Sequence, residues 1–215
     1  VKLIITRILE NKGTLLAHSM GLGKTLSAIT VMDSLMRHNK AKMLLLCPKT
    51  VLYNWPSELD KWDNHLALLW YSPIDDGNHS DIARWNRKGG LLIMGHERFR
   101  KYQSDCTPSL SPDILFIDEA HKLKNEENML YKAVSALTIP KILLTGSPMQ
   151  NHFREYCTMV GLVSDQVDTK TLKTEFADAI EACNMADASS AAISEGKAKM
   201  RAFTLLTSSC VHRRS

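Results

Sequence analysis

The sequence predicts an α/β protein in which a mostly parallel sheet carries helices on both faces. Between Gly13 and Val163, short apolar runs typical of buried strands alternate with stretches whose apolar residues recur every three or four positions. This alternation indicates strands joined by crossover helices, which is how parallel sheets are organised. Ligands bind such sheets beyond the carboxyl ends of the strands, so the residues directly after each apolar run are the first candidates for a functional site.

The individual elements follow from the same periodicity. We expect strands at residues 13–18, 42–48, 66–72, 90–96, 113–118 and 141–146. We expect helices at residues 24–38, 51–62, 80–88, 97–103 and 128–137. Ser164–Ser215 has no further strand-like run and is rich in Ala, Lys, Glu and Ser, so it is predicted to be helical, around 170–183 and 196–211. The chain therefore divides into an α/β domain, residues 1–163, and a helical extension, residues 164–215.

The composition limits the class of protein. The 215 residues carry a formal net charge of +4, a mild excess that permits an anionic partner such as nucleic acid without requiring one. The five cysteines are odd in number and form no C-x-x-C pair, which argues against a zinc site or disulfide framework and favours a reducing intracellular compartment. No apolar run approaches the ~20 residues of a membrane span, and no secretory signal is present, so we expect a soluble protein without a membrane partner.

The stretch "HSMGLGKT", His18 to Thr25, follows the first predicted strand and precedes an amphipathic helix. It fits the phosphate-loop pattern G-x-x-x-x-G-K-[ST], except that His18 stands where the first glycine is expected. Backbone N–H groups of such loops converge on phosphate oxygens, and Gly21 and Gly23 permit that close approach. Lys24 is predicted to hold the β and γ phosphates, and the Thr25 hydroxyl to ligate Mg²⁺. The alternative is a chance "GKT" at a strand-to-helix turn.

The stretch "DILFIDEAH" predicts a buried strand that ends in two adjacent carboxylates. Charges at the end of an apolar strand are costly unless they meet a cation or do chemistry. Asp118 is suited to hold Mg²⁺ through its water shell, and Glu119 to orient and deprotonate an attacking water. Because neighbouring side chains leave a strand on opposite faces, we expect the two to address different targets. The alternative is an ordinary N-cap for the next helix.

Four motifs in order, "MGLGKT", "LLLCPKTVLYNW", "DILFIDEAHKLKN" and "LLTGSPMQN", resemble the first-lobe motifs of the Swi/Snf-type ATPases of helicase superfamily two. They cover Gly13 to Asn151. The likeness is closest to the ATRX-like chromatin remodellers, which share His18, "RWNRKGGLLIMGHERFR", "NHFREYCTMVGLV" and the terminal "CVHRR". Ser147 and Met149 depart from the family's Thr and Leu but keep similar size and chemistry. The resemblance implies a RecA-like P-loop NTPase lobe, with a DEAH box, over residues 1–163.

The resemblance also implies a role for each matching residue. Those implied to contact nucleotide are Met20, Gly21, Leu22, Gly23, Lys24, Thr25 and Gln150. Lys49 and Thr50 are implied to grip the DNA backbone, and His96 and Arg98 to form a second nucleic-acid-facing loop, where a solvated turn and an exposed helix face are the alternatives.

Three further residues are implied to couple the nucleotide site to the DNA surface: His121, Thr145 and Ser147. A Ser-Pro turn, and a helix-start histidine without a task, are the alternatives. The tryptophans are expected to pack in the core and carry no function: Trp55, Trp62, Trp70 and Trp85.

By resemblance, the chain is the ATP-binding lobe of a double-stranded-DNA-dependent ATPase and translocase of chromatin, located in the nucleus. ATP and Mg²⁺ are the implied cofactors, and DNA, nucleosomes or chromatin proteins the implied partners. The family needs a second lobe with an arginine finger, and no later motif follows Val163, so we expect a fragment that is weak or inactive alone. Two alternatives stay open: a non-hydrolysing DNA- or chromatin-protein-binding module, and an RNA helicase lobe, although "LLTGSPMQN" differs from the Ser-Ala-Thr motif of RNA helicases.

Overall fold

The computed structural model describes residues 1–19, 21–39, 41–62, 79–105, 110–146 and 152–214. In these ranges the chain forms a six-stranded sheet with the strand order β3-β2-β4-β5-β1-β6, and every pairing is parallel. The strands are β1 (Thr14–His18), β2 (Lys42–Cys47), β3 (Gly90–Gly95), β4 (Ile114–Ile117), β5 (Lys141–Thr145) and β6 (Val211–Arg214). Parallel pairing brings all the carboxyl ends to one edge of the sheet, where the candidate residues follow.

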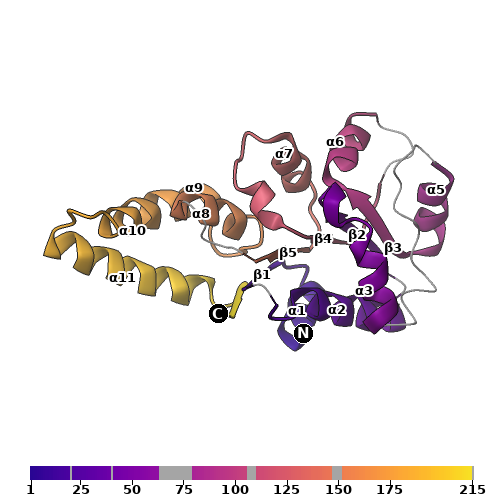
Figure 1. The fold of residues 1–215 in the computed structure, drawn as a ribbon, viewed down its shortest axis with the longest axis horizontal. Coiled ribbons are helices and arrows are strands. Elements are labelled where there is room, and N and C mark those ends of the chain that lie inside the picture. The colour runs from indigo at the N-terminus through magenta and orange to yellow at the C-terminus, as the bar shows by residue number, and fades with distance from the viewer. Residues whose placement is uncertain (20, 40, 63–78, 106–109, 147–151, 215) are drawn as a thin grey trace.

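Helices cover both faces of the sheet (Figure 1). The α-helices are α1 (Lys2–Leu9), α2 (Lys24–Asn39), α3 (Asn54–Trp62), α5 (His79–Lys88), α6 (His96–Asp105), α7 (Met129–Ser135), α8 (Phe153–Gly161), α9 (Thr169–Leu172), α10 (Asp178–Cys183) and α11 (Ser190–Thr207). Short 3-10 turns follow two strands, namely η1 (Lys49–Val51) and η2 (Ala120–Leu123), and a π-helical stretch, η3 (Lys173–Ala177), joins α9 to α10.

The two faces of the sheet bury two separate apolar clusters. Along β2, Leu44 and Leu46 pack with α5, α6, α7 and α8. Met43, Leu45 and Cys47 pack on the opposite face with α1, α2 and α3. Alternate residues of a strand point to opposite faces, so a strand that is buried on both sides reads as a continuous apolar run. The predicted fold class is therefore confirmed, and the predicted strands within the described ranges are all present. The predicted strand at 66–72 lies outside the described residues.

The expectation that no strand follows Val163 is wrong. The segment 164–215 is helical from α9 to α11, but it then returns to the sheet as β6, which pairs with β1 so that Leu15 lies opposite Val211. The sequence "VHRR" carries no apolar run: in this edge strand Val211 is buried, whereas His212 is half-buried and Arg213 is exposed. The sequence also gave no assignment for α1 or α8, which pack Ile4 and Tyr156 into the two clusters.

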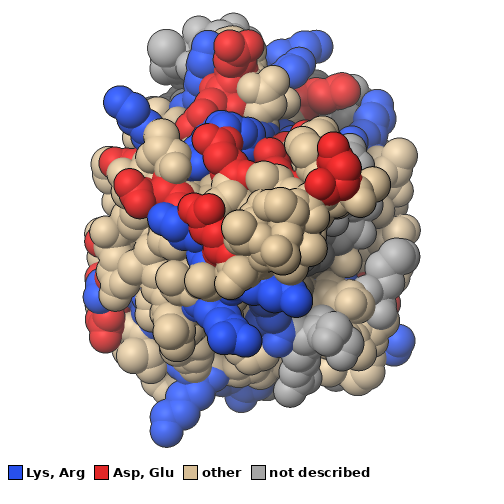
Figure 2. Space-filling model, turned by 90° about the vertical axis from the view of Figure 1, so that its left-hand side faces the viewer, with Lys and Arg blue, Asp and Glu red and all other residues tan. Residues whose placement is uncertain are grey.

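Helices α8 to α11 extend from one side of the sheet as an arm (Figure 1). A cluster of aromatic rings packs α11 against α8 and η3 within the arm: the ring centroid of Phe203 on α11 lies 4.8 Å from that of Phe153 and 5.6 Å from that of Phe176. Seen from the end of the arm, the surface presents acidic as well as basic side chains (Figure 2). Several of these charges pair, as Lys173 does with Glu126 at 2.7 Å. No helix in the described ranges combines the length and apolar character needed to cross a membrane.

Candidate functional site

The glycine-rich loop leaves the buried end of β1 and enters α2 at Lys24. Gly21 and Gly23 have φ angles of +79° and +77°, in the left-handed region that favours glycine. A Cβ at either position would meet no atom within 4 Å, so the backbone conformation, and not lack of space, requires glycine there. The loop leads directly into the N-terminus of a 16-residue helix, where anions are favoured. Met20 lies outside the described residues.

Lys24 bends back over the loop that precedes it. Its Nζ donates hydrogen bonds to the carbonyl oxygens of His18, at 3.0 Å, and Ser19, at 3.3 Å. Thr25 follows on the first turn of α2, and Lys24 and Thr25 both line a cavity beside the loop. The ammonium group is thus held in the loop by neutral acceptors, which an anion could replace at a gain in electrostatic energy.

The backbone oxygen of His18 accepts a hydrogen bond from Lys24, while its side chain contacts the neighbouring strand of the sheet. The ring is 2 % exposed, and its Nε2 lies 2.8 Å from Nδ1 of His212 on the neighbouring edge strand β6. The histidine in place of the pattern's first glycine therefore ties β1 to β6. Thr145, at the end of β5, is buried opposite Ala17 of β1, so it lies close to where the loop leaves the sheet.

The acidic pair follows β4, which ends at Ile117. Asp118 continues the sheet by donating its N–H to Leu46 O at 2.8 Å. Its Oδ1 accepts the Glu119 N–H at 2.9 Å, and its Oδ2 accepts the Trp55 indole N–H at 3.0 Å. Burial raises the pKa of Asp118 above its ordinary value, and these two hydrogen bonds act against the rise. Trp55 was expected to have no function, because the apolar pattern around a tryptophan does not indicate which acceptor its indole N–H will find.

The two carboxylates diverge, though not by strand alternation as expected. Glu119 stands beyond the strand with φ +51° and ψ +48°, a left-handed conformation uncommon for a residue with a Cβ. Asp118 lines the cavity beside the loop, whereas Glu119 lines a second cavity. His121 on η2 lies with Nδ1 3.0 Å from Glu119 Oε2, so its contact is with the acidic residue.

The cavity beside the loop has a volume of about 570 Å³. It brings together five of the predicted residues, Gly21, Gly23, Lys24, Thr25 and Asp118, with Trp55. Leu22 lies on the exposed side of the loop. Gln150 and Ser147 lie outside the described residues, so their predicted roles stay predictions.

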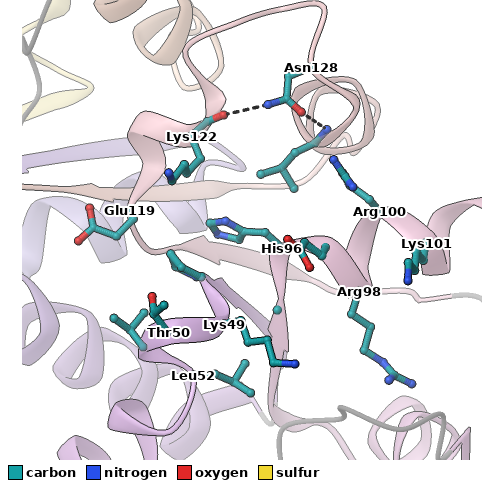
Figure 3. A pocket seen from close by; sticks show the side chains of 15 residues that line it. Lys49, Thr50, Leu52, His96, Arg98, Arg100, Lys101, Glu119, Lys122 and Asn128 are labelled. Atoms are coloured by element: carbon teal, nitrogen blue, oxygen red, sulfur yellow. Dashed lines mark hydrogen bonds between the residues drawn. The ribbon is translucent and has the colours of Figure 1, made fainter.

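The second cavity, of about 860 Å³, opens at the carboxyl ends of β2 and β3 (Figure 3). Among the described residues that line it, five are cations and two are carboxylates: Lys49, Arg98, Arg100, Lys101, Lys122, Glu97 and Glu119. Figure 3 shows the side chains of Lys49, on η1, and Arg98, on α6, extending toward the same side of the cavity, while Thr50 lies on the other side of η1. The predicted nucleic-acid residues therefore meet around one cationic surface, and three further cations, missed in the sequence, join them.

Two buried nitrogens at this cavity lack partners. Within the part of the chain that the structure describes, neither His96 Nε2 nor Arg98 Nε has a hydrogen-bond acceptor or donor opposite it. Buried polar atoms in folded proteins usually have a hydrogen-bond partner, so both nitrogens can bond a ligand that enters the cavity. Burial lowers the pKa of His96 to about 4, so at neutral pH its ring offers a hydrogen bond and no charge.

The pKa of His96 predicts a loss of stability in mild acid. A pKa lowered from 6.5 to about 4 means that the unfolded chain binds a proton first, so stability present above the unfolded value falls as the pH drops toward 4. Between about pH 7 and about pH 5 this amounts to roughly 2 kcal/mol. Urea denaturation of wild type and His96→Asn at both pH values measures it. Equal pH dependence in the two proteins would show that His96 does not titrate in this way.

Fold and site together define a class of protein: a parallel α/β lobe with a glycine-rich loop and an acidic strand end at one edge of the sheet. A family model described as SNF2-related domain matches residues 1–215, and the chain belongs to this family. The resemblance to Swi/Snf-type ATPases is thereby confirmed.

Known relatives agree in both sequence and fold. The chain is 31% identical to the DNA repair and recombination protein RAD54-like of Gallus gallus, over 97% of this chain and 31% of the relative. It is 33% identical to the Transcriptional regulator ATRX homolog of Caenorhabditis elegans, over 79% of this chain and 15% of the relative. It thus spans less than a third of these relatives.

A solved structure, the "Sulfolobus solfataricus SWI2/SNF2 ATPase core in complex with dsDNA", matches with a TM-score of 0.77 and 23% identity, over 99% of this chain and 42% of that one. At this identity the likeness shows the RecA-like fold.

Proposed function

We propose that this chain is the ATP-binding lobe of a double-stranded-DNA-dependent ATPase that translocates on DNA in chromatin. The observation that carries the proposal is the pairing of two cavities at one sheet edge. One is built for phosphates and a divalent cation, and the other is lined by an excess of cations. The relatives named RAD54-like and ATRX support DNA or chromatin partners and a nuclear location for the whole protein.

The residues at the first cavity fit ATP and Mg²⁺. The loop glycines permit backbone N–H groups to face phosphate oxygens, and Lys24 supplies the cation that meets the outer phosphates. The Thr25 hydroxyl and the Asp118 carboxylate would hold Mg²⁺, which when bound neutralises charge on the phosphates. Glu119 is proposed to orient and deprotonate the attacking water, and His121 Nδ1 lies 3.0 Å from its Oε2.

The residues at the second cavity fit a sugar-phosphate backbone. Lys49, Arg98 and Thr50 offer two charges and a hydroxyl, groups that commonly contact phosphate oxygens, so contacts there are proposed to be independent of sequence. The unpartnered Nε of Arg98 adds a hydrogen-bond donor that a phosphate oxygen would satisfy. Thr145 and Ser147, after β5, are proposed to couple the two cavities.

Turnover is proposed to require a second motor lobe. In other NTPases an arginine supplied to the transition state contributes about 10³ to 10⁵ in rate. We therefore expect the 215-residue chain to bind Mg²⁺·ATP and duplex DNA but to hydrolyse ATP slowly. Hydrolysis by the chain alone at the rate of a complete motor would contradict the need for that lobe.

The function is tested by equilibrium binding. Titration calorimetry with Mg²⁺·ATPγS tests the first cavity, and fluorescence anisotropy with duplex DNA, single-stranded DNA and duplex RNA tests the second. The proposal expects nucleotide binding and a preference for duplex DNA. A chain that binds DNA but does not bind nucleotide would support a non-hydrolysing module. A preference for RNA would support an RNA helicase lobe.

The salt dependence of duplex binding gives a sharper prediction. Replacing Lys49 or Arg98 by Ala is expected to weaken binding similarly for every DNA sequence and to reduce the slope of log K against log salt by about 1, because each cation releases about one counterion. Lys197→Ala is the matched control, since Lys197 is exposed and does not line the cavity, and it belongs to α11 of the arm that extends away from the sheet (Figure 1). A slope that is the same in all variants would remove these residues from the interface.

A further inference from the structure

Trp55 satisfies its indole N–H in an unusual way. The side chain is 2 % exposed and packs in the apolar cluster beneath α3. Trp85, which is equally buried, donates its N–H to a backbone oxygen, that of Gly90, at 3.0 Å. Trp55 instead donates to the carboxylate of Asp118, at 3.0 Å from Oδ2. A core tryptophan therefore holds the residue proposed to carry the metal.

This hydrogen bond fixes the orientation of the Asp118 carboxylate. One oxygen accepts the Glu119 N–H and the other the Trp55 N–H, so rotation about the last side-chain bond would break both. Each carboxylate oxygen can accept more than one hydrogen bond, so capacity remains for the water shell of a metal. Partners of this kind set the geometry of metal ligands, and their loss typically weakens metal affinity about 10- to 100-fold.

The segment that carries Trp55 also forms a wall of the cationic cavity. Lys49 and Thr50 line that cavity, Val51 lines both cavities, and Trp55 follows Val51 by one helical turn. The segment from Pro48 to Trp62 thus contributes lining residues to both cavities. A ligand that moves or rigidifies η1 therefore acts on the segment that carries Trp55, and Trp55 in turn contacts Asp118.

We propose that Trp55 positions Asp118 and, through the segment it shares with Lys49, couples nucleic-acid binding to Mg²⁺·nucleotide binding. This role rests on the proposed function. Coupling between two sites is reciprocal, so duplex DNA tightens Mg²⁺·nucleotide binding by the same factor as the nucleotide tightens DNA binding. Trp55 is a positioning residue, because it touches Asp118 and no reacting atom.

The test separates positioning from packing. The Kd of ATPγS is measured for the 215-residue chain with Mg²⁺ or with EDTA, and with or without saturating duplex DNA. In wild type, DNA is expected to tighten Mg²⁺·ATPγS binding by about fivefold or more. Trp55→Phe keeps an aromatic ring but removes the N–H. It is expected to weaken the Mg²⁺-dependent affinity about 10-fold and to bring the DNA effect close to one, with the affinity in EDTA unchanged.

Trp85→Phe is the matched control. It removes an indole N–H from a fully buried tryptophan that lines neither cavity and donates to Gly90 O at 3.0 Å. This variant is expected to keep the wild-type coupling. If Trp55→Phe also keeps it, or if wild type binds both ligands without coupling, the inference is wrong while the proposed function stands. If wild type binds neither ligand, both fail.

A measurement on wild type covers the case in which Trp55→Phe does not fold. The chain contains four tryptophans, so its ¹⁵N spectrum has few indole signals, and the Trp85 variant helps to assign them. Duplex DNA without nucleotide is expected to shift the Trp55 indole signal, as is Mg²⁺·ATPγS without DNA. An indole signal that responds to one ligand and not to the other would overturn the coupling.

Discussion

Replacing Lys24 by Ala is expected to weaken Mg²⁺·ATPγS binding between about 10- and 100-fold. Hydrogen bonds to charged groups contribute about 1.5–3 kcal/mol, and Lys24 is the cation of the loop that ends at α2. Its present acceptors are the carbonyls of His18 and Ser19 in a partly exposed loop, so the loss of those contacts costs little stability. Calorimetric titration measures the affinity, and urea denaturation confirms that the fold persists.

Lys197→Ala and Lys24→Arg complete the experiment. The first removes an exposed lysine from α11 and is expected to leave the affinity unchanged. The second keeps the charge but replaces a compact ammonium with a planar guanidinium, so it is expected to recover part of the affinity. Wild-type affinity in Lys24→Ala would mean that the loop does not hold the phosphates.

The largest effect on stability is expected for Phe203→Ala, at about 3–5 kcal/mol. Phe203 is fully buried and meets Phe153, Tyr156 and Phe176, with centroid distances of 4.8, 5.8 and 5.6 Å. The ring packs α11 against α8 and η3, and β6 follows α11 directly. Native domains are stable by about 5–15 kcal/mol, so this single change removes a large share.

Leu205→Ala is the matched control on the same helix. Leu205 is 76% exposed, so truncation is expected to change the free energy of unfolding by no more than about 0.5 kcal/mol. Urea denaturation compares the two variants. If the urea midpoints of the two variants shift equally, the aromatic cluster does not hold α11 against α8 and η3.

The parallel lobe could be predicted because its strands are buried on both faces. Leu44, Leu45 and Leu46 read as one apolar run, although they serve two different clusters. The edge strand β6, which pairs with β1, could not be predicted in this way, because "VHRR" contains a single apolar residue, Val211. Trp62 was expected in the core but is 47% exposed, since a tryptophan's position on a helix, and not its hydrophobicity, decides its burial.

The site was predictable where its chemistry is local in sequence. Lys24 and Thr25 are adjacent, and Asp118 and Glu119 follow one strand, so motif spacing and parallel pairing bring them to the same sheet edge. Contacts between distant residues were not predictable. The Trp55–Asp118 hydrogen bond joins positions 63 residues apart, and Lys122 reaches the cationic cavity only through the turn that follows Glu119.

Hydrogen exchange of the 215-residue chain tests most directly whether the two cavities take two different ligands. Mg²⁺·ATPγS alone is expected to slow amide exchange in the loop that includes Gly21 and Gly23, at the start of α2 and around Asp118. Duplex DNA alone is expected to slow exchange in η1 and the first turns of α6. Protection of the same segments by both ligands, or protection confined to the arm, would contradict the assignment of nucleotide to one cavity and DNA to the other.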